Sequence, residues 1–153
     1  MSATPTSGGA PPVEYYPLPP ALQLPFSEAV RVGHMLYCSG QMGTDDGGQL
    51  VAGGIEAETK QTLANIKAAL QRHGSSMDRV VKATVMMADM SEWPVMNAVY
   101  VTHFPAQLPA RSAFGCSGLA MGGPIRKRCD ILWCNSVRRF QSSGLRYRET
   151  ASC

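Results

Sequence analysis

The stretch LPARSAFGCSGLA, residues 108–120, carries a single charged side chain among small and apolar neighbours. Its residues alternate as in a β-strand, and Arg111 stands near its start. A guanidinium on a partly buried strand stays charged and therefore needs an anion beside it. The nearest acidic residues in the sequence are Glu92 upstream and Asp130 downstream. We therefore expect Arg111 to bind either an acidic residue across a subunit boundary or an anionic ligand.

The sequence before this strand has the patterns of two helices and three further strands. Residues 27–41 predict two short strands around a turn at Gly33–His34, because apolar residues alternate on both sides of the turn. The clearest helix covers residues 55–74, with acidic side chains in its first turn and glycine at its end. One face of this helix carries Thr59, Leu63, Ile66 and Leu70.

The next strand and the second helix lead directly to the Arg111 strand. Residues 79–90 are β-branched and predict a strand, with Val81, Ala83, Val85 and Met87 on one side. Ser91 is the expected N-cap of the second helix, whose inner stripe would be Val95, Val99 and Phe104. The order β-β-α-β-α-β, followed by at most one more strand, predicts an α+β sandwich with the helices on one face of a sheet.

Composition describes an ordinary globular protein of one domain. The chain has 153 residues, of which 44% are hydrophobic and 16% charged. No apolar run reaches the length of a membrane span, and the N-terminus has the features of neither a secretory nor a mitochondrial signal, so we expect a cytoplasmic protein. The five cysteines follow no CxxC spacing, and the three histidines are isolated in the sequence. We therefore expect no metal site and no cofactor.

The two ends of the chain differ from its body. Residues 1–25 are rich in Pro, Gly and Ser and predict a disordered arm before a folded domain over residues 26–134. Residues 135–153 form a basic tail whose structure the sequence leaves open. Up to Pro124 the chain has seven basic and nine acidic residues, whereas from Ile125 onward it has seven basic and two acidic residues. By its charge the body is therefore not expected to bind nucleic acid, and only the basic tail could do so.

Four blocks resemble the reactive intermediate deaminase family, the Rid or YjgF-type proteins. In chain order they are PFSEAV, LYCSGQMG, VVKATVMMADMSEWPVMNAVY and LPARSAFGCSGLA, which together span residues 25–120. The resemblance implies a chorismate-mutase-like fold, with a mixed sheet covered on one face by two helices. It also implies a homotrimer with its sites between subunits. The implied reaction is the cofactor-independent hydrolysis of 2-imino or enamine acids to 2-keto acids and ammonia.

The resemblance also offers an anion for Arg111, because the Arg of the family's PARS motif holds the substrate carboxylate. A planar guanidinium grips a carboxylate through two parallel charge-assisted hydrogen bonds, and this orients the attached C=N carbon. Orientation is much of what the reaction needs, since an imine is already electrophilic.

Further site residues follow from the matched blocks. Ser39 and Gly40 match a strand end that lines the family's cleft, and Asn97 matches a position near the substrate. Backbone groups near Ser39 and Cys116 would hydrogen-bond the nitrogen and the water. Phe26 stands where many members have Tyr, which removes a hydroxyl and leaves an apolar wall.

The last strand departs from the family pattern. The family usually places a Glu about fifteen residues after the Arg, where it positions or activates the attacking water. An ungapped comparison puts Arg126 at that place. A second register makes CDILWC, residues 129–134, the final strand, with Asp130 as the carboxylate. A third interpretation is that the sequence after residue 134 diverges, so that the protein keeps the Arg111 pocket and loses much of the chemistry.

Three function classes therefore remain open at this point. The first is the deaminase, with Arg111 as the substrate anchor and Asp130 as a candidate catalytic carboxylate. The second is a non-catalytic module that binds small carboxylates in the same pocket. The third is the RNA-cleaving or translation-inhibiting activity attributed to some family members, for which the basic tail would have to supply the phosphate contacts.

Overall fold

A computed structural model of the chain describes residues 9–116 and 129–131. Short 3-10 turns lie at Pro20–Leu22 (η1), Met77–Arg79 (η2) and Met90–Glu92 (η3). The strands and helices in chain order are β1 (Val13–Pro17), β2 (Ser27–Val32), β3 (Met35–Cys38), β4 (Gln41–Met42), α1 (Gly54–Arg72), β5 (Lys82–Met87), α2 (Trp93–Thr102), β6 (Ala110–Gly115) and β7 (Cys129–Ile131). No helix within the described residues is long and apolar enough to cross a membrane.

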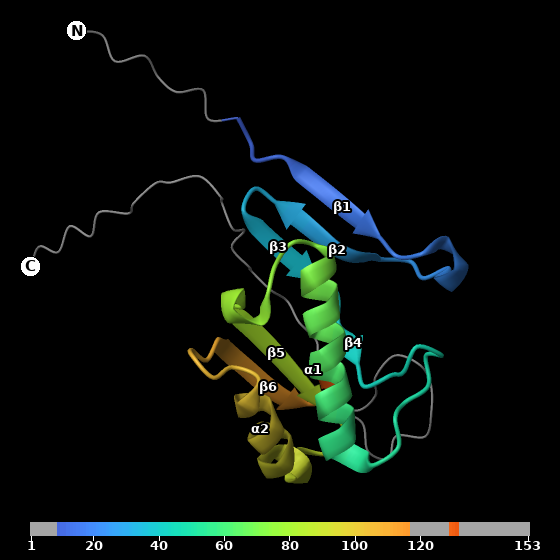
Figure 1. Cartoon of the computed structure of the whole chain (residues 1–153), viewed down its shortest axis with the longest axis vertical. Coiled ribbons are helices and arrows are strands. Elements are labelled where there is room, and N and C mark those ends of the chain that lie inside the picture. The colour runs from blue at the N-terminus through green and yellow to red at the C-terminus, as the bar shows by residue number, and fades with distance from the viewer. Residues whose placement is uncertain (1–8, 117–128, 132–153) are drawn as a thin grey trace, which may run out of the picture.

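The strands form two sheets, and the helices pack on one side of them. β1, β2 and β3 make an antiparallel sheet, while the second sheet has the order β4-β7-β5-β6. The second sheet is mixed, because β5 pairs parallel with β6 and antiparallel with β7. The two helices contact each other, and Figure 1 shows them in front of the strands, on the face turned toward the viewer. The expected α+β architecture, with two helices on a mixed sheet, is confirmed.

The core lies between the two helices and the sheets, and both sheets contribute residues to it. The predicted inner face of α1 is confirmed, since Thr59, Leu63, Ile66 and Leu70 are all buried. β5 alternates strictly between buried and half-buried positions, and its buried residues are Ala83, Val85 and Met87. Val81 was expected on the same side, but it precedes β5 and is 44% exposed. Burial of each larger side chain in this layer stabilises the fold by about 1.5–3 kcal/mol.

α2 begins differently from the sequence prediction. The side chain of Asp89, not Ser91, is the cap: it accepts a hydrogen bond of 2.8 Å from the Ser91 backbone N–H and starts η3. α2 itself begins at Trp93, and the predicted inner stripe is confirmed at Val99 and Phe104 but is wrong at Val95, which is 44% exposed. The buried residues of this helix are Met96, Val99 and Tyr100.

Part of the N-terminal segment is ordered, so the prediction of a disordered arm over residues 1–25 is wrong for residues 13–22. β1 pairs with β2 in the register Val13↔Val32. Tyr16 packs against the core, and its ring centroid lies 4.4 Å from that of His73. The high Pro and Gly content of the segment hid a strand that is stabilised by contacts with distant residues.

α1 is also tied to the second sheet by its own side chains. The amide nitrogen Nδ2 of Asn65 donates to the backbone carbonyls of Met42 and Thr44, each at 2.9 Å. A Cβ atom at Gly43 would lie 2.6 Å from the Glu58 carbonyl oxygen, so only glycine allows this close approach of β4 to the helix.

The first testable prediction concerns the docking of β1. Tyr16→Ala removes the ring that packs on His73 and should lower the free energy of unfolding by about 1–3 kcal/mol. Leu22→Ala is the matched control, because that side chain is 53% exposed and should be nearly neutral. Urea unfolding of both variants makes the measurement, and equal stability of the two would mean that the segment does not dock.

Candidate functional site

Arg111 lies on β6 and faces the inner side of α2. In the parallel pairing of β5 and β6, Arg111 stands opposite the buried Ala83, on the side of the sheet that the helices cover. Trp93, Asn97 and Tyr100 are spaced by four and three residues, so they share one face of α2. The spacing of α2 and the register of β6 together place these three side chains around one guanidinium.

The guanidinium of Arg111 is held on several sides. Nη2 donates a hydrogen bond of 2.8 Å to Oδ1 of Asn97. The carbon Cζ lies 4.5 Å from the ring centroid of Trp93 and 4.5 Å from that of Tyr100. Both distances are within the range in which a cation is attracted to an aromatic ring. Asn97, Trp93 and Tyr100 therefore fix the orientation of the guanidinium.

The charge of Arg111 is not balanced by a neighbouring acid. Among the residues that the structure describes, no carboxylate lies within 4.0 Å of the guanidinium, and the buried Nη1 has no hydrogen-bond partner. The hydroxyl of Tyr100 is also buried without a partner in the same described part of the chain. Burial raises the pKa of Tyr100 to about 12, although the charge of Arg111 opposes this shift, so the hydroxyl keeps its proton. The cluster is a cation with donors that have no partner among the described residues, and such a donor set has the chemistry to accept an anion.

Cys116 lies just beyond the end of the Arg111 strand. Its backbone N–H donates to the Met87 carbonyl at 2.9 Å, and its Sγ lies 3.6 Å from the same oxygen. These contacts hold the chain end of β6 against the end of β5. The structure thus brings Asn97 to Arg111 and places Cys116 directly after the strand that carries Arg111, five residues later in the sequence.

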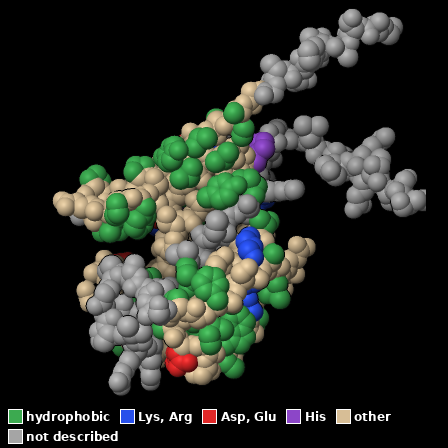
Figure 2. Space-filling model, turned by 180° about the vertical axis from the view of Figure 1, so that it is seen from behind, with side chains coloured by type: hydrophobic (Ala, Val, Ile, Leu, Met, Phe, Trp, Pro, Cys, Tyr) green, Lys and Arg blue, Asp and Glu red, His purple; other side chains and the backbone are tan. Residues whose placement is uncertain are grey.

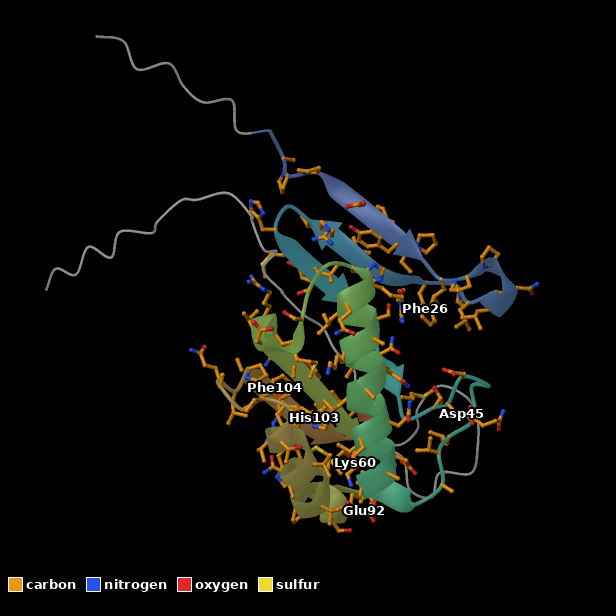
Figure 3. The ribbon with its side chains drawn as sticks, viewed as in Figure 1. Phe26, Asp45, Lys60, Glu92, His103 and Phe104 are labelled. Carbon is orange, nitrogen blue, oxygen red and sulfur yellow. The ribbon has the colours of Figure 1, made fainter. Side chains whose placement is uncertain are left out.

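The other predicted site residues lie elsewhere in the chain. Phe26 precedes β2, is 50% exposed, and lies beside the three-stranded sheet, well away from α2 (Figure 3). Ser39 and Gly40 follow β3. The Ser39 hydroxyl donates to the Ser27 carbonyl at 2.6 Å, so it joins the two ends of the hairpin. Within one chain, the described contacts of Arg111 do not include Phe26, Ser39 or Gly40.

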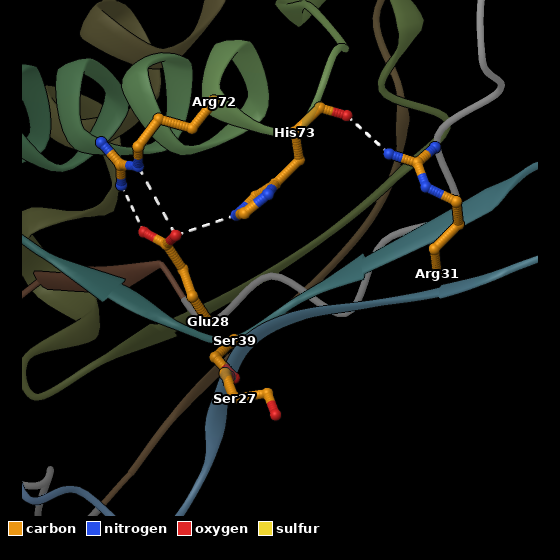
Figure 4. A network of polar contacts seen from close by, with 6 residues as sticks. All are labelled: Ser27, Glu28, Arg31, Ser39, Arg72 and His73. Carbon is orange, nitrogen blue, oxygen red and sulfur yellow. Dashed lines mark hydrogen bonds and ion pairs between the residues drawn. The ribbon is translucent and has the colours of Figure 1, made fainter. Parts of the chain in front are cut away.

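A polar network that the sequence analysis missed fixes this second group of residues. The carboxylate of Glu28 accepts hydrogen bonds from Arg72 and from Nε2 of His73, the latter at 2.8 Å (Figure 4). Nη2 of Arg31 donates to the His73 carbonyl at 2.6 Å. The backbone of Glu28 also accepts a hydrogen bond of 2.9 Å from the Ser39 N–H. The network therefore joins the C-terminal end of α1 to the strand ends that carry Ser27 and Ser39.

The pKa values of Glu28 and of the nearby Cys38 are shifted by burial and by the charged partners in this network. Burial raises the pKa of Glu28, but the hydrogen bonds and charges of Arg72 and His73 outweigh it, so the pKa lies below its ordinary value of 4.5. Burial, followed by the negative charge of Glu28, raises the pKa of the nearby Cys38 thiol to about 11. Glu28 and Arg72 lie more than forty positions apart, which is why no local sequence pattern revealed the pair.

The last strand is present at the position that the second register predicted. Cys129–Ile131 forms β7 between β4 and β5, whereas Arg126, the residue of the ungapped comparison, lies outside the described residues. Asp130 stands opposite Met86, whereas Arg111 stands opposite Ala83. Because neighbours in a strand alternate between faces, positions 130 and 111 belong to opposite faces of the sheet. A catalytic role of Asp130 stays a prediction.

A cavity of about 530 Å³ lies elsewhere, where the C-terminal half of α1 faces the end of α2. Lys67, Asp78 and His103 line it, together with the buried Phe104. None of the predicted site residues lines this cavity. Among the described residues no group of three His, Cys, Asp or Glu side chains is arranged to hold a metal ion.

Comparisons with known proteins agree with this fold. A family model described as endoribonuclease L-PSP matches residues 19–125. Mouse and human proteins named 2-iminobutanoate/2-iminopropanoate deaminase are 42% and 40% identical to this chain. The matches cover 69% and 66% of this chain, and 79% and 74% of the relatives.

Solved structures lead to the same family. The crystal structure of yeast Mmf1 has a TM-score of 0.70 and is 27% identical, covering 82% of this chain and 94% of its own. RidA from an Antarctic Psychrobacter has a TM-score of 0.67 and is 31% identical, with the same coverage. The chain belongs to the endoribonuclease L-PSP family, which comprises the YjgF and Rid proteins. The resemblance of the four sequence blocks is thereby confirmed.

The second testable prediction uses the lowered pKa of Glu28. As pH falls below 4.5, the unfolded chain binds a proton on this carboxyl before the folded chain does, so stability decreases until the lower folded pKa has been passed. Glu28→Gln should be less stable at neutral pH and should lose less stability over this acidic range. Urea unfolding at several pH values makes the comparison.

The control for this prediction is Glu56→Gln, which removes an exposed carboxylate paired with Lys60 on α1. Solvent screens that pair, so its effect should be small at every pH. If Glu28→Gln and the parent protein lose stability in parallel on acidification, the network does not hold Glu28 in its ionised form.

Proposed function

We propose that this protein is a cofactor-independent deaminase that hydrolyses reactive 2-imino and enamine acids to 2-keto acids and ammonia. The observation that carries the proposal is the oriented Arg111 guanidinium, whose Nη1 is buried without a partner among the described residues. A substrate carboxylate is the anion that such a donor set fits. The mouse and human relatives named as deaminases of 2-iminobutanoate and 2-iminopropanoate support the same substrate class.

The chemistry needs little beyond this anchor. The substrate carboxylate binds Arg111, and this places the adjacent C=N carbon at a defined distance from the strand. Water adds to that carbon, the nitrogen takes up a proton, and the tetrahedral adduct releases ammonia as the C=O bond forms. One imino acid and one water thus yield one keto acid and one ammonia. Asp130 remains a candidate for activating the water. Because positions 130 and 111 belong to opposite faces of the sheet, Asp130 would have to act on a substrate that is bound by Arg111 of another subunit.

The alternative functions have less support. RNA cleavage would require several cations along a phosphate backbone, and the chain up to Pro124 has an excess of acidic residues. A non-catalytic carboxylate-binding module would use the same Arg111 site. Release of ammonia distinguishes this module from the enzyme.

We propose further that the protein is a homotrimer whose sites lie between subunits. The outer face of the three-stranded sheet supports this assembly, because it is apolar on all three strands and lies on the side away from the helices (Figure 2). Its members are Val13, Tyr15, Val30, Val32, Met35 and Tyr37. The separation of Phe26 and Ser39 from Arg111 in one chain is also consistent with a site completed by a neighbour.

The third testable prediction concerns Arg111. Arg111→Lys keeps the charge and loses the planar donor fork, and Arg111→Ala loses both. Since hydrogen bonds to charged groups are worth about 1.5–3 kcal/mol each, kcat/KM of the Ala variant should fall roughly a hundredfold or more. The Lys variant should recover little of this loss. The assay couples an amino-acid oxidase, which generates the imine, to detection of released ammonia.

Lys60→Ala serves as the control, because it removes an exposed cation from α1 and should keep full activity. A melting curve accompanies each variant. Deaminase activity that persists in Arg111→Ala while the melting temperature collapses would make Arg111 a structural residue and refute the proposed anchor.

The fourth testable prediction concerns the assembly. The parent protein should sediment as a trimer at micromolar concentration, and Tyr37→Glu should shift it toward the monomer by placing a charge on the apolar sheet face. Val101→Glu, on the exposed surface of α2, is the matched control and should remain trimeric. A parent protein that sediments as a monomer would contradict the assembly and the intersubunit site together.

A further inference from the structure

Two buried donors in the Arg111 cluster have no partner among the residues that the structure describes. They are the Tyr100 hydroxyl and Nη1 of Arg111, and the two side chains are in contact, since Cζ of Arg111 lies 4.5 Å from the Tyr100 ring centroid. The third such group within the described residues is the Ser75 hydroxyl, in the turn after α1. Proteins rarely bury polar groups without a partner, so each of these atoms requires an explanation.

Packing explains the ring of Tyr100 but not its hydroxyl. The side chain is 2% exposed, and its ring contacts both Arg111 and Phe104, whose ring centroid is 4.8 Å away. Phenylalanine would make the same ring contacts without burying an unsatisfied hydroxyl. The hydroxyl is therefore a cost to the empty protein, and a ligand that accepts its hydrogen bond would offset that cost.

The donors are fixed before any ligand arrives. Asn97 accepts from Nη2 of Arg111, so the guanidinium cannot rotate freely, and Nη1 keeps both of its N–H groups available. Tyr100 is held by its contacts with the ring of Phe104 and with the guanidinium. Burial raises the pKa of Tyr100 to about 12, so the hydroxyl is protonated at neutral pH and can donate.

We propose that Tyr100 is a substrate-binding residue, whose hydroxyl donates a second hydrogen bond to the carboxylate that Arg111 holds through Nη1. The inference rests on the proposed function and deepens it. A carboxylate has two oxygens and accepts from both donors, whereas a neutral amide offers one acceptor oxygen and places an NH2 group against a cation. Tyr100 thus makes the site selective for acids over their amides.

The test measures binding of 2-oxobutanoate, the keto acid that hydrolysis of 2-iminobutanoate yields, to the full chain by calorimetry. Tyr100→Phe should weaken binding about tenfold or more, because it removes a hydrogen bond to a charged group. In the deaminase assay KM should rise with little change in kcat, because the hydrogen bond to the carboxylate is made equally in the bound substrate and in the transition state. The melting temperature of the unliganded variant should be unchanged or higher, since an unsatisfied buried hydroxyl has been removed.

Ser75→Ala is the matched control, because it removes the other buried hydroxyl without a described partner and should leave binding unchanged. Unchanged affinity of Tyr100→Phe would overturn the inference, and so would weaker binding accompanied by a clear fall in the melting temperature. If Arg111→Lys loses affinity and Tyr100→Phe does not, the inference alone fails. If neither variant loses affinity, the carboxylate anchor of the proposed function fails as well.

Discussion

The parallel pairing of β5 with β6 is the constraint on which the candidate site depends. Two consecutive strands pair in parallel only if the chain crosses back over the sheet, and here α2 makes that crossing. In the observed register Arg111 stands opposite the buried Ala83, so it lies on the face of β6 that the helix covers. This connection brings the cationic side chain of Arg111 on the strand against the aromatic rings of Trp93 and Tyr100 on the helix.

Sequence reasoning succeeded where the pattern is local and failed where the partner is distant. The inner face of α1 could be predicted, because its apolar spacing within 19 residues follows the helical period. Trp93 and Tyr100 were not identified as neighbours of Arg111, because that contact depends on the register between β5 and β6. β1 was missed for a similar reason, since it is held by its pairing with β2 and by the stacking of Tyr16 on His73.

The candidate site itself was predicted in part. Arg111 and Asn97 were named from the matched sequence blocks, and the structure joins them by one hydrogen bond. Phe26, Ser39 and Gly40 came from the same blocks, yet they belong to the hairpin side of the chain, where Glu28 and His73 determine the local geometry. A sequence comparison states which residues occur in a family's site, but it does not state which of them one chain can bring together.

α1 has a further consequence for how the molecule opens. Within the described residues the two sheets share no backbone ladder, and α1 contacts both of them through side chains: Asn65 near one sheet, and Arg72 and His73 near the other. The hairpin sheet also contributes the buried Ala29 and Leu36 to the core that it shares with α1 and the second sheet. Opening of the hairpin would therefore expose part of that common core, so its amide exchange should be coupled to the stability of the layer beneath α1. The described side-chain contacts of Arg111, in contrast, all come from α2 and would not be broken directly by that opening.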